Sequence, residues 1–315
     1  MKALHSAIVT LIGLTAAAGA WAQPLLAPAE LEALRPNPAV RIIDVRDARS
    51  YAANHIPGAV SAPYGSWRGP ASNPGELPAL EKLTALVQKL GLSPSSHAVV
   101  VSSGADQTDF GSAARVYWTL KVLGLKELSI LNGGIKAWDE AKLPQDSQPV
   151  TVAATNFQPT LDQRLIATRE EVQKAATSNS AQLVDARPEA FFSGETRHQA
   201  AKYPGTLKGA VNLEHSRWFE RGTSKMVTGD GARLLAAGLP ANGNTDTVSF
   251  CNTGHWAATN WFALSEVAGQ QNVSLYAGSM VDFTQNGDGD LVANVPGRAQ
   301  QLLIDAKLWV ERTFN

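Results

Sequence analysis

The chain has 315 residues, a formal net charge of −1 at pH 7 and a single cysteine. The near-neutral charge, spread without a basic cluster, excludes an extended phosphate-binding surface, so we expect neither nucleic acid nor a membrane as a partner. The length is that of roughly two domains, and one cysteine excludes an internal disulfide.

The first 22 residues have the pattern of a secretory signal peptide. Lys2 provides a basic start, residues 7–19 form a short apolar run, and Ala20-Trp21-Ala22 is a cleavage sequence of the A-x-A type. The apolar run is too short for a good membrane anchor. We therefore expect cleavage after Ala22 and a mature protein that is exported to the periplasm.

Strands and helices alternate through the first half of the mature chain. A linker over 23–28 is followed by a helix over 29–34, a strand over 40–46, a helix over 80–90, a strand over 98–101, a helix over 113–123, a strand over 128–131 and a turn into a helix over 132–138. This alternation predicts an α/β fold with a mainly parallel sheet flanked by helices.

The same signals return in the second half of the chain. The matched segments are 42–46 with 182–187, 57–61 with 208–212, 113–120 with 257–264, and 131–135 with 275–279. Matches in the same order indicate an internal duplication, so one α/β domain is used twice.

We therefore divide the chain into a signal peptide and two domains. The predicted boundaries are 1–22 for the signal peptide, 23–145 for the first domain, 146–164 for the linker and 165–315 for the second domain. The amphipathic segment over 300–310 predicts a C-terminal helix, which we expect to pack on the second domain rather than to recruit a partner.

The one cysteine lies where a strand changes into a helix in the second copy. An apolar run over 247–250 reaches Cys251, a tight segment follows, and the helical pattern begins at Ala257. Converging backbone N–H groups and the positive end of a helix favour a thiolate over a thiol. An unpaired thiol in an oxidising compartment also favours function, although a buried cysteine that packs as a small hydrophobe is the alternative.

The first copy has no cysteine at the corresponding place. Its strand leads into a longer loop over 102–111 that starts with two serines, Ser102 and Ser103, and no convincing base accompanies either of them. We therefore interpret the first domain as structural, helping to form a cleft, and assign the activity to the second domain.

Together these motifs resemble the rhodanese family of sulfurtransferases in its tandem-domain form. The motifs are an Asp-x-Arg after the first strand of each copy, the segments 55–59 and 132–138, and a six-residue loop that begins at Cys251 in the second copy only. The resemblance implies two rhodanese-like domains, an inactive first domain, a persulfide mechanism and an active site in the cleft between the domains.

The residues support the same chemistry. A Cys251 thiolate would take the outer sulfur of a small donor such as thiosulfate or 3-mercaptopyruvate, and a thiol, cyanide or a protein acceptor would then remove it. No metal and no organic cofactor is needed for these steps. The N–H groups expected to surround and bind the sulfur are those of Asn252, Thr253, Gly254, His255 and Trp256.

Several positions leave the choice of substrate open. The Cys251 loop contains neither Arg nor Lys, so His255 either binds an anionic donor, protonates a leaving group or faces solvent without a role. Trp256 stands where the family often has Ser or Thr, and either narrows the pocket or favours a larger donor. Arg187 contacts the substrate or forms an internal ion pair with Asp185, for which we favour a structural role. We expect Trp218, Trp261 and Phe262 to be packing residues, and of these Trp218 is the best candidate for lining the entrance.

A rival function comes from a different class of protein. In a binding or relay protein, Cys251 would accept sulfur or an oxidised thiol from a specific partner without multiple turnovers. A purely structural role is disfavoured, because only one of the two copies has lost its cysteine.

Overall fold

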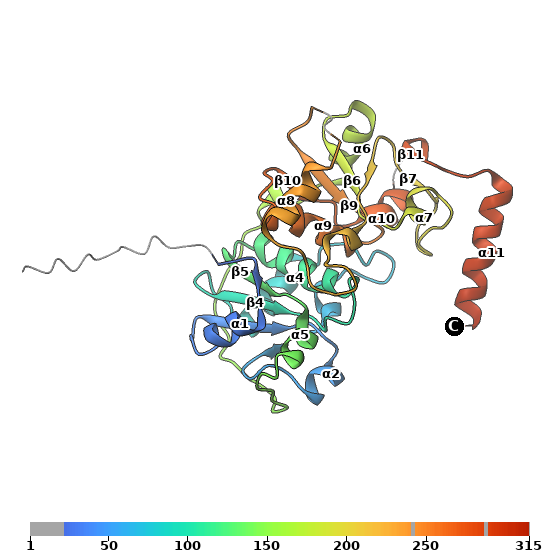
Figure 1. Cartoon of the computed structure of the whole chain (residues 1–315). Helices are drawn as coiled ribbons and strands as arrows, with labels where there is room; N and C mark the ends of the chain where they lie inside the picture. The colour runs from blue at the N-terminus through green and yellow to red at the C-terminus, as the bar shows by residue number, and fades with distance from the viewer. Residues whose placement is uncertain (1–21, 241–242, 287–288, 315) are drawn as a thin grey trace, which may run out of the picture.

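The computed structural model describes residues 22–240, 243–286 and 289–314 of the chain (Figure 1). The predicted signal peptide lies outside the described residues, apart from Ala22. Within the described ranges, each helix is too short or too polar to cross a lipid bilayer.

The first domain is built on a parallel sheet with the strand order β1-β5-β4-β2-β3. Its strands are β1 (Leu25–Leu26), β2 (Val40–Asp44), β3 (Val60–Ser61), β4 (His97–Val101) and β5 (Glu127–Leu131). Its helices are α1 (Pro28–Leu34), α2 (Ala48–Ala53), η1 (Tyr64–Trp67), α3 (Leu80–Lys89), α4 (Phe110–Val122) and α5 (Gly134–Glu140). Neighbouring residues of β4, Val99 and Val100, belong to different core clusters, so both faces of the sheet are covered.

The second domain repeats this arrangement with the strand order β10-β9-β6-β8, again parallel. Its strands are β6 (Gln182–Asp185), β8 (Val211–Asn212), β9 (Thr247–Phe250) and β10 (Val273–Leu275), with a small antiparallel pair of β7 (Thr206–Leu207) and β11 (Val292–Ala293). Its helices are α6 (Arg169–Ser178), α7 (Glu189–Phe192), α8 (Gly229–Ala237), α9 (Trp256–Phe262), α10 (Ser279–Asn286) and α11 (Arg298–Phe314). Short helical turns are η2 (Gln163–Leu165), η3 (His215–Trp218), η4 (Ala263–Val267) and η5 (Gly289–Leu291). The predicted α/β architecture with two flanked parallel sheets is confirmed.

The prediction of a linker over 23–28 is wrong in part. Leu25 and Leu26 form β1, which pairs in parallel with β5, and both side chains are buried. Two apolar residues are too few to show a period of two, so the sequence pattern did not reveal this edge strand.

The segment between the domains lies along the first one. Thr155 donates its N–H to the Gln88 carbonyl at 3.0 Å, and Gln88 Nε2 donates to the Phe157 carbonyl at 2.9 Å. The N–H of Asp162 donates to the Val122 carbonyl at the end of α4 at 2.8 Å. These bonds attach the segment to α3 and α4, while the domain boundaries themselves stay predictions.

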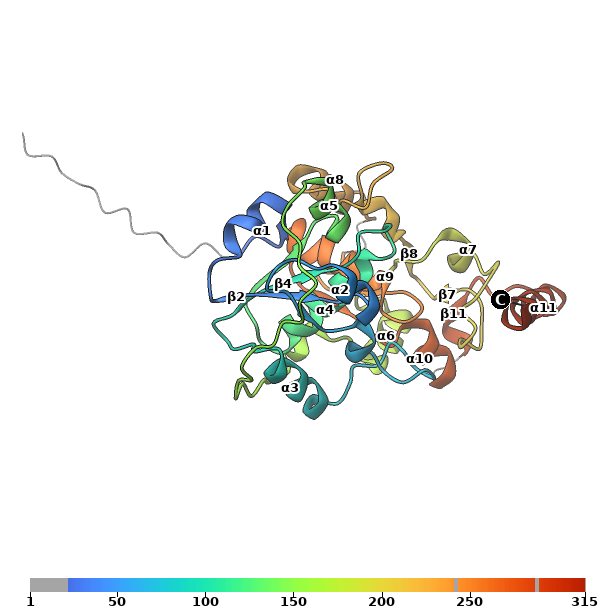
Figure 2. The same cartoon turned by 90° about the horizontal axis from the view of Figure 1, so that it is seen from below.

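The two domains meet through matching helices, α4 and α9, which lie side by side between the two sheets (Figures 1 and 2). Phe262 packs edge-on against Tyr117 and Phe110, with ring centroids 4.9 and 5.7 Å apart. The hydroxyl of Tyr117 donates a hydrogen bond to Glu266 at 2.7 Å, and Glu266 also pairs with Lys121 Nζ at 2.5 Å. The interface therefore has an apolar centre with a polar contact at one end.

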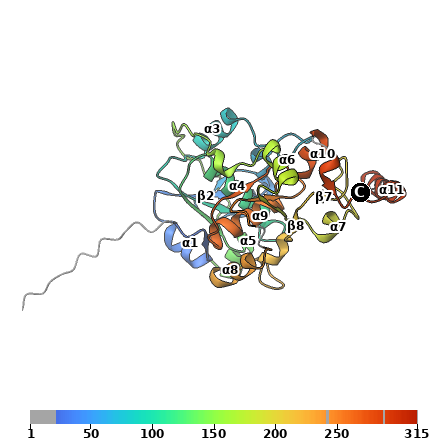
Figure 3. The same cartoon turned by 90° about the horizontal axis from the view of Figure 1, so that it is seen from above.

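The C-terminal helix α11 differs from its prediction. It stands apart from the body of the second domain in all views (Figures 1 and 3), and the Leu302 and Trp309 side chains are 69% and 56% exposed. Ile304 is buried, and Asp305 pairs with Arg197 of the domain at 2.7 Å. The helix thus contacts the second domain through a small part of its surface.

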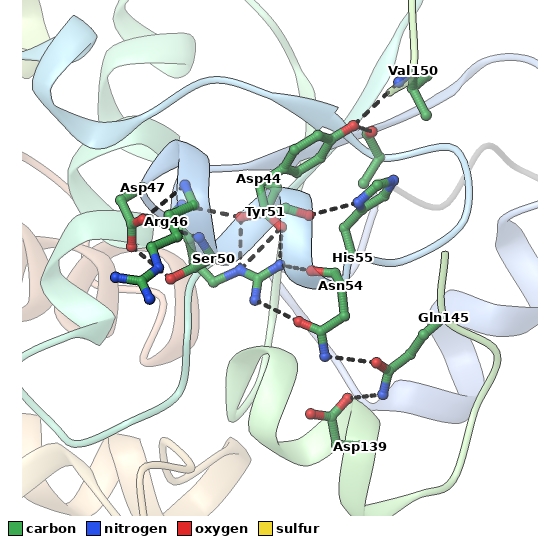
Figure 4. Close-up of polar contacts among 12 residues, drawn as sticks. Asp44, Arg46, Asp47, Ser50, Tyr51, Asn54, His55, Asp139, Gln145 and Val150 are labelled. Atoms are coloured by element: carbon green, nitrogen blue, oxygen red, sulfur yellow. Dashed lines mark hydrogen bonds and ion pairs between the residues drawn. The ribbon is translucent and has the colours of Figure 1, made fainter. Parts of the chain in front are cut away.

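Each Asp-x-Arg motif forms a buried ion pair at the end of a central strand. In the first copy, Arg46 Nη2 lies 2.6 Å from Asp44 Oδ2 and donates to the Asn54 carbonyl at 2.6 Å, as Figure 4 shows. Asn54 continues the network to Gln145, which contacts Asp139 (Figure 4). The pair therefore ties the end of β2 to α2 and to the segment that follows α5.

We predict that Asp44→Ala will lower the free energy of unfolding by about 3–5 kcal/mol, because it leaves the Arg46 charge buried without its partner. Urea unfolding measures this loss. Asp162→Ala is the matched control, since Arg164 and Asp162 form the same type of pair at 2.7 Å with the arginine side chain 89% exposed. That change should lower stability by about 0–1 kcal/mol. Equal losses in the two variants would contradict the prediction.

Candidate active site

The Cys251 loop, residues 251–255, joins β9 to α9 at the carboxyl end of the second sheet. The first turn of α10 holds it from one side. The N–H groups of Met280 and Val281 donate to the carbonyls of Cys251 and Asn252, each at 3.0 Å. The loop carbonyls are therefore bound by a helix N-terminus, where unpaired N–H groups are available.

The Ser279 hydroxyl bridges two N–H groups of this loop. Its Oγ accepts from Cys251 N at 3.0 Å and from Gly254 N at 3.1 Å, and it donates to the Tyr276 carbonyl at 2.8 Å. Gly254 therefore does not direct its N–H to the sulfur as the sequence analysis expected. The backbone N–H groups that have no acceptor among the described residues are those of Asn252, Thr253, His255 and Trp256. Sequence reasoning missed Ser279, because no pattern marks a lone serine after a strand.

The first copy holds its loop in the same way. The N–H of Ile135 donates to the Ser102 carbonyl at 3.0 Å, as the N–H of Met280 does to Cys251. This alignment is shifted by one residue from the sequence match of the two turns. Ser102 therefore occupies the place of Cys251, and the two loops differ in chemistry more than in backbone structure.

Cys251 lies at the domain interface and is covered. Its exposed fraction is 1%, and it belongs to the buried apolar cluster that includes residues of both domains. A hollow of about 880 Å³ elsewhere in the described structure is lined by residues such as Lys121 and Glu266, and no residue of the Cys251 loop lines it. Cys251 is thus buried between the domains in this structure, an arrangement that we call the closed state.

His255 connects the loop to the first domain. Its Nε2 lies 2.8 Å from the Thr108 carbonyl, and its Nδ1 lies 2.9 Å from Tyr64 Oη. A carbonyl only accepts, so Nε2 carries the proton and Nδ1 accepts from the tyrosine hydroxyl. Arg68 Nη1 in turn donates to Tyr64 Oη at 2.7 Å. The chain of donors from Arg68 to Thr108 thus selects one neutral tautomer.

The surroundings of His255 also keep it uncharged. Burial, with the positive charge of Arg68 adding to it, lowers the pKa of His255 to about 4. At neutral pH this side chain is therefore neither a cation for an anionic donor nor a ready proton source, and it does not face solvent freely. Its hydrogen bonds to Thr108 and Tyr64 connect the Cys251 loop to the first domain.

Arg187 and Asp185 form the ion pair that the sequence analysis gave as one alternative. Arg187 Nη2 lies 2.6 Å from Asp185 Oδ2 and 2.8 Å from the Gly205 carbonyl, and both side chains are buried. Arg187 Nη1 reaches the loop by donating to Asn252 Oδ1 at 3.3 Å. The positive charge of Arg187 is thus balanced within the protein.

The two tryptophans have different surroundings. Trp256 is half-buried and stacks on His215 with ring centroids 4.9 Å apart, and its Nε1 is buried without an acceptor among the described residues. Trp218 is fully buried and donates its Nε1 to Asn260 Oδ1 at 2.9 Å. Trp218 is therefore a packing residue, as expected, and its buried ring does not line an entrance.

Sequence reasoning gave the first domain a part in forming the cleft but did not identify which of its residues approach the Cys251 loop. Arg115 of α4 is fully buried, and a Cβ atom added to Gly254 would lie 2.5 Å from its Nη1. Tyr64 and Arg68 approach through His255. The signal in the sequence was a charged residue inside an otherwise apolar helical run, since arginine is rarely fully buried without a partner.

We predict that Gly254→Ala will destabilise the protein and distort the loop. Gly254 has φ +70°, and the new Cβ would lie 2.4 Å from the Ala277 carbonyl oxygen as well as against Arg115. Gly269→Ala is the control, because Gly269 has φ +77° with open space around it. The left-handed backbone costs about 1–2 kcal/mol in either variant, so urea unfolding should show a larger loss for Gly254→Ala. Equal losses would contradict the packing argument.

We predict that His255→Gln will flatten the pH dependence of stability in acid. Because the folded state lowers the pKa of His255 from 6.5 to about 4, the unfolded chain binds more protons between these values. This contribution is complete above pH 6.5 and is lost as the pH falls towards 4. Urea unfolding from pH 7 to 4 should show a smaller decline in the variant. The same decline of stability with pH in wild type and variant would contradict the lowered pKa of His255.

Comparisons with known proteins agree with this organisation. Residues 27–141 and 168–286 each match the rhodanese-like domain family. A putative thiosulfate sulfurtransferase of Mycobacterium tuberculosis is 30% identical over 258 residues, which cover 78% of this chain and 89% of the relative. The 3-mercaptopyruvate sulfurtransferase of Escherichia coli K12 is 27% identical over 264 residues, which cover 80% of this chain and 92% of the relative.

A solved structure shows the same two-domain fold. The crystal structure of the 3-mercaptopyruvate sulfotransferase SseA from Escherichia coli superposes with a TM-score of 0.70 at 25% sequence identity, covering 82% of this chain and 98% of that chain. Both domain matches and the relatives span most of the described residues. The chain therefore belongs to the rhodanese family of sulfurtransferases, in its tandem-domain form.

Proposed function

We propose that this protein moves a sulfane sulfur from a small anionic donor to a thiol or cyanide through a persulfide on Cys251. The observation that carries the proposal is the placement of the one cysteine in a loop whose N–H groups at Asn252, Thr253 and His255 lack acceptors among the described residues. Ser102 occupies the corresponding place in the first copy, which supports a division in which the second domain alone carries sulfur.

The donor step with thiosulfate conserves charge. The Cys251 thiolate attacks the outer sulfur, a new S–S bond forms, the S–S bond of the donor breaks, and sulfite leaves with the electron pair. With 3-mercaptopyruvate, the C–S bond breaks instead, and pyruvate leaves as an enolate that takes a proton from solvent. Loop N–H groups stabilise the persulfide anion, as donors do in oxyanion holes, where one is typically worth about 3–4 kcal/mol.

Access to the sulfur requires movement at the interface. Cys251 is 1% exposed, and the Tyr64–His255 hydrogen bond of 2.9 Å joins the two domains beside it. We infer that donor entry separates this contact and that the persulfide is held in the closed state. Exclusion of water would also protect the reactive sulfur from side reactions.

The burial of Cys251 also favours a second candidate function. A partner protein that opens the interface could deliver or collect sulfur without multiple turnovers, so that the protein acts as a relay. Measuring both the loading of Cys251 and its turnover separates the two functions, because a relay is loaded once and an enzyme turns over.

We predict that wild-type protein, prepared from a periplasmic fraction where we expect it to begin at Gln23, gains one sulfur atom on Cys251 from thiosulfate or 3-mercaptopyruvate. Mass spectrometry measures this loading, and thiocyanate formation with cyanide measures turnover. Cys251→Ser should abolish both, because serine cannot hold a persulfide, whereas Ser102→Ala should retain both.

The possible results are distinct. Loading without turnover favours the relay. Turnover that persists in Cys251→Ser, or an unmodified Cys251 after exposure to every donor, would contradict the proposed chemistry.

A further inference from the structure

In the donor step, negative charges repel one another, and the Cys251 loop of the second domain has no positive charge to offset this repulsion. A thiolate that attacks thiosulfate brings together three negative charges, and the Cys251 loop contains neither lysine nor arginine. His255 is neutral, because its pKa is lowered to about 4, and the charge of Arg187 is balanced by Asp185. A cation from another part of the molecule would remove this repulsion.

Arg115 of the first domain has unused hydrogen-bond donors at this place. The side chain is fully buried, and its Nη2 donates to the Gly75 carbonyl at 2.8 Å. Its Nε and Nη1 are buried and have no acceptor among the described residues. Buried polar groups in proteins are nearly always satisfied, so two orphaned donors on one guanidinium need an explanation.

One of the two orphaned nitrogens of Arg115 lies against the Cys251 loop. A Cβ atom added to Gly254 would lie 2.5 Å from Nη1. Arg68 lies nearby, since its charge lowers the pKa values of both Arg115 and His255. Among the described residues, neither Arg115 nor Arg68 forms an ion pair with a carboxylate. Two uncompensated guanidinium groups thus lie beside the loop that holds the sulfur.

The charge on Arg115 persists despite burial. Burial, with the positive charge of Arg68 adding to it, lowers the pKa of Arg115 to about 10, while ionised Tyr64 or Cys251 acts in the opposite direction. The guanidinium is therefore charged at neutral pH. A buried charge without a counter-ion is unfavourable, and a bound anion would balance it.

We propose that Arg115 binds an oxygen of the oxyanion group of the sulfur donor through Nη1. The proposal rests on the sulfur transfer proposed above. A charged N–H donor forms a strong hydrogen bond with an oxygen of a sulfonate or a carboxylate. The domain without a cysteine then supplies the positive charge that binds thiosulfate or 3-mercaptopyruvate and stabilises the departing anion. Two contacts would also be made by an arginine with a purely structural role. These are the Trp118 ring, whose centroid lies 5.0 Å from the guanidinium carbon, and the hydrogen bond to the Gly75 carbonyl.

The test compares charged donors with an uncharged probe of the same sulfur. Loading of Cys251 by thiosulfate and by 3-mercaptopyruvate is followed by mass spectrometry in wild type and Arg115→Gln. Alkylation of Cys251 by iodoacetamide, which has no charge, reports access to the sulfur and its reactivity. Arg41→Gln is the matched control, because Arg41 also has a buried Nε without an acceptor among the described residues but packs near Gly91 in the first domain.

We expect Arg115→Gln to slow loading by the anionic donors by about 10- to 100-fold, the range of a charged hydrogen-bonding contact. Alkylation by iodoacetamide should change by less than about 3-fold, and Arg41→Gln should leave all rates near those of wild type. Slower loading by thiosulfate alone would mean that Arg115 binds a sulfonate group. Slower loading by both donors would mean that it binds either a sulfonate or a carboxylate.

Other results would overturn the proposal. Equal loss of loading and alkylation would mean that Arg115 only supports the loop, and unchanged loading would mean that it has no part in binding. If Arg115→Gln does not fold, Arg115→Lys decides, because it keeps the charge but has no nitrogen at the Nη1 position, so unchanged loading by both donors would also overturn the proposal. A wild-type protein that no donor loads would instead refute the proposed sulfur transfer itself.

Discussion

The packing of α4 against α9 is the contact on which the candidate active site depends. It places Arg115 against Gly254, and the neighbouring η1 segment brings Tyr64 to within 2.9 Å of His255. The aromatic centre of the interface, formed by Phe262 with Tyr117 and Phe110, packs the two helices against each other. The loop that carries Cys251 is therefore completed by side chains from a domain that has no cysteine.

The duplication produced two loops with one backbone design and different chemistry. In both copies, a following helix donates N–H groups to the carbonyls of the loop, at Ser102 in one and at Cys251 in the other. The buried Asp-x-Arg pairs stabilise the strand ends in the same way. The two copies therefore share a hydrogen-bonded frame and differ in the residue, Ser102 or Cys251, that this frame holds at the end of the strand.

Burial determines what each basic side chain near the sulfur can contribute. His255 loses its charge readily because its ordinary pKa lies near neutrality, and burial beside Arg68 lowers it to about 4. Arg115 starts from a much higher pKa, so burial leaves it charged with a pKa of about 10. The sequence analysis named His255 as the only candidate cation within the Cys251 loop, and of His255 and Arg115 only the arginine keeps its charge at neutral pH.

The sequence by itself determined the α/β class, the duplication, the family resemblance and the candidate cysteine, because these depend on local periodicity and on motifs repeated in order. It did not reveal β1, whose two residues are too few to show a pattern, or the exposed position of α11. Ser279, Tyr64 and Arg115 were decided only by the tertiary structure. Their contacts with the Cys251 loop depend on how separate helices and two domains fit together, and no short-range spacing in a chain encodes such a fit.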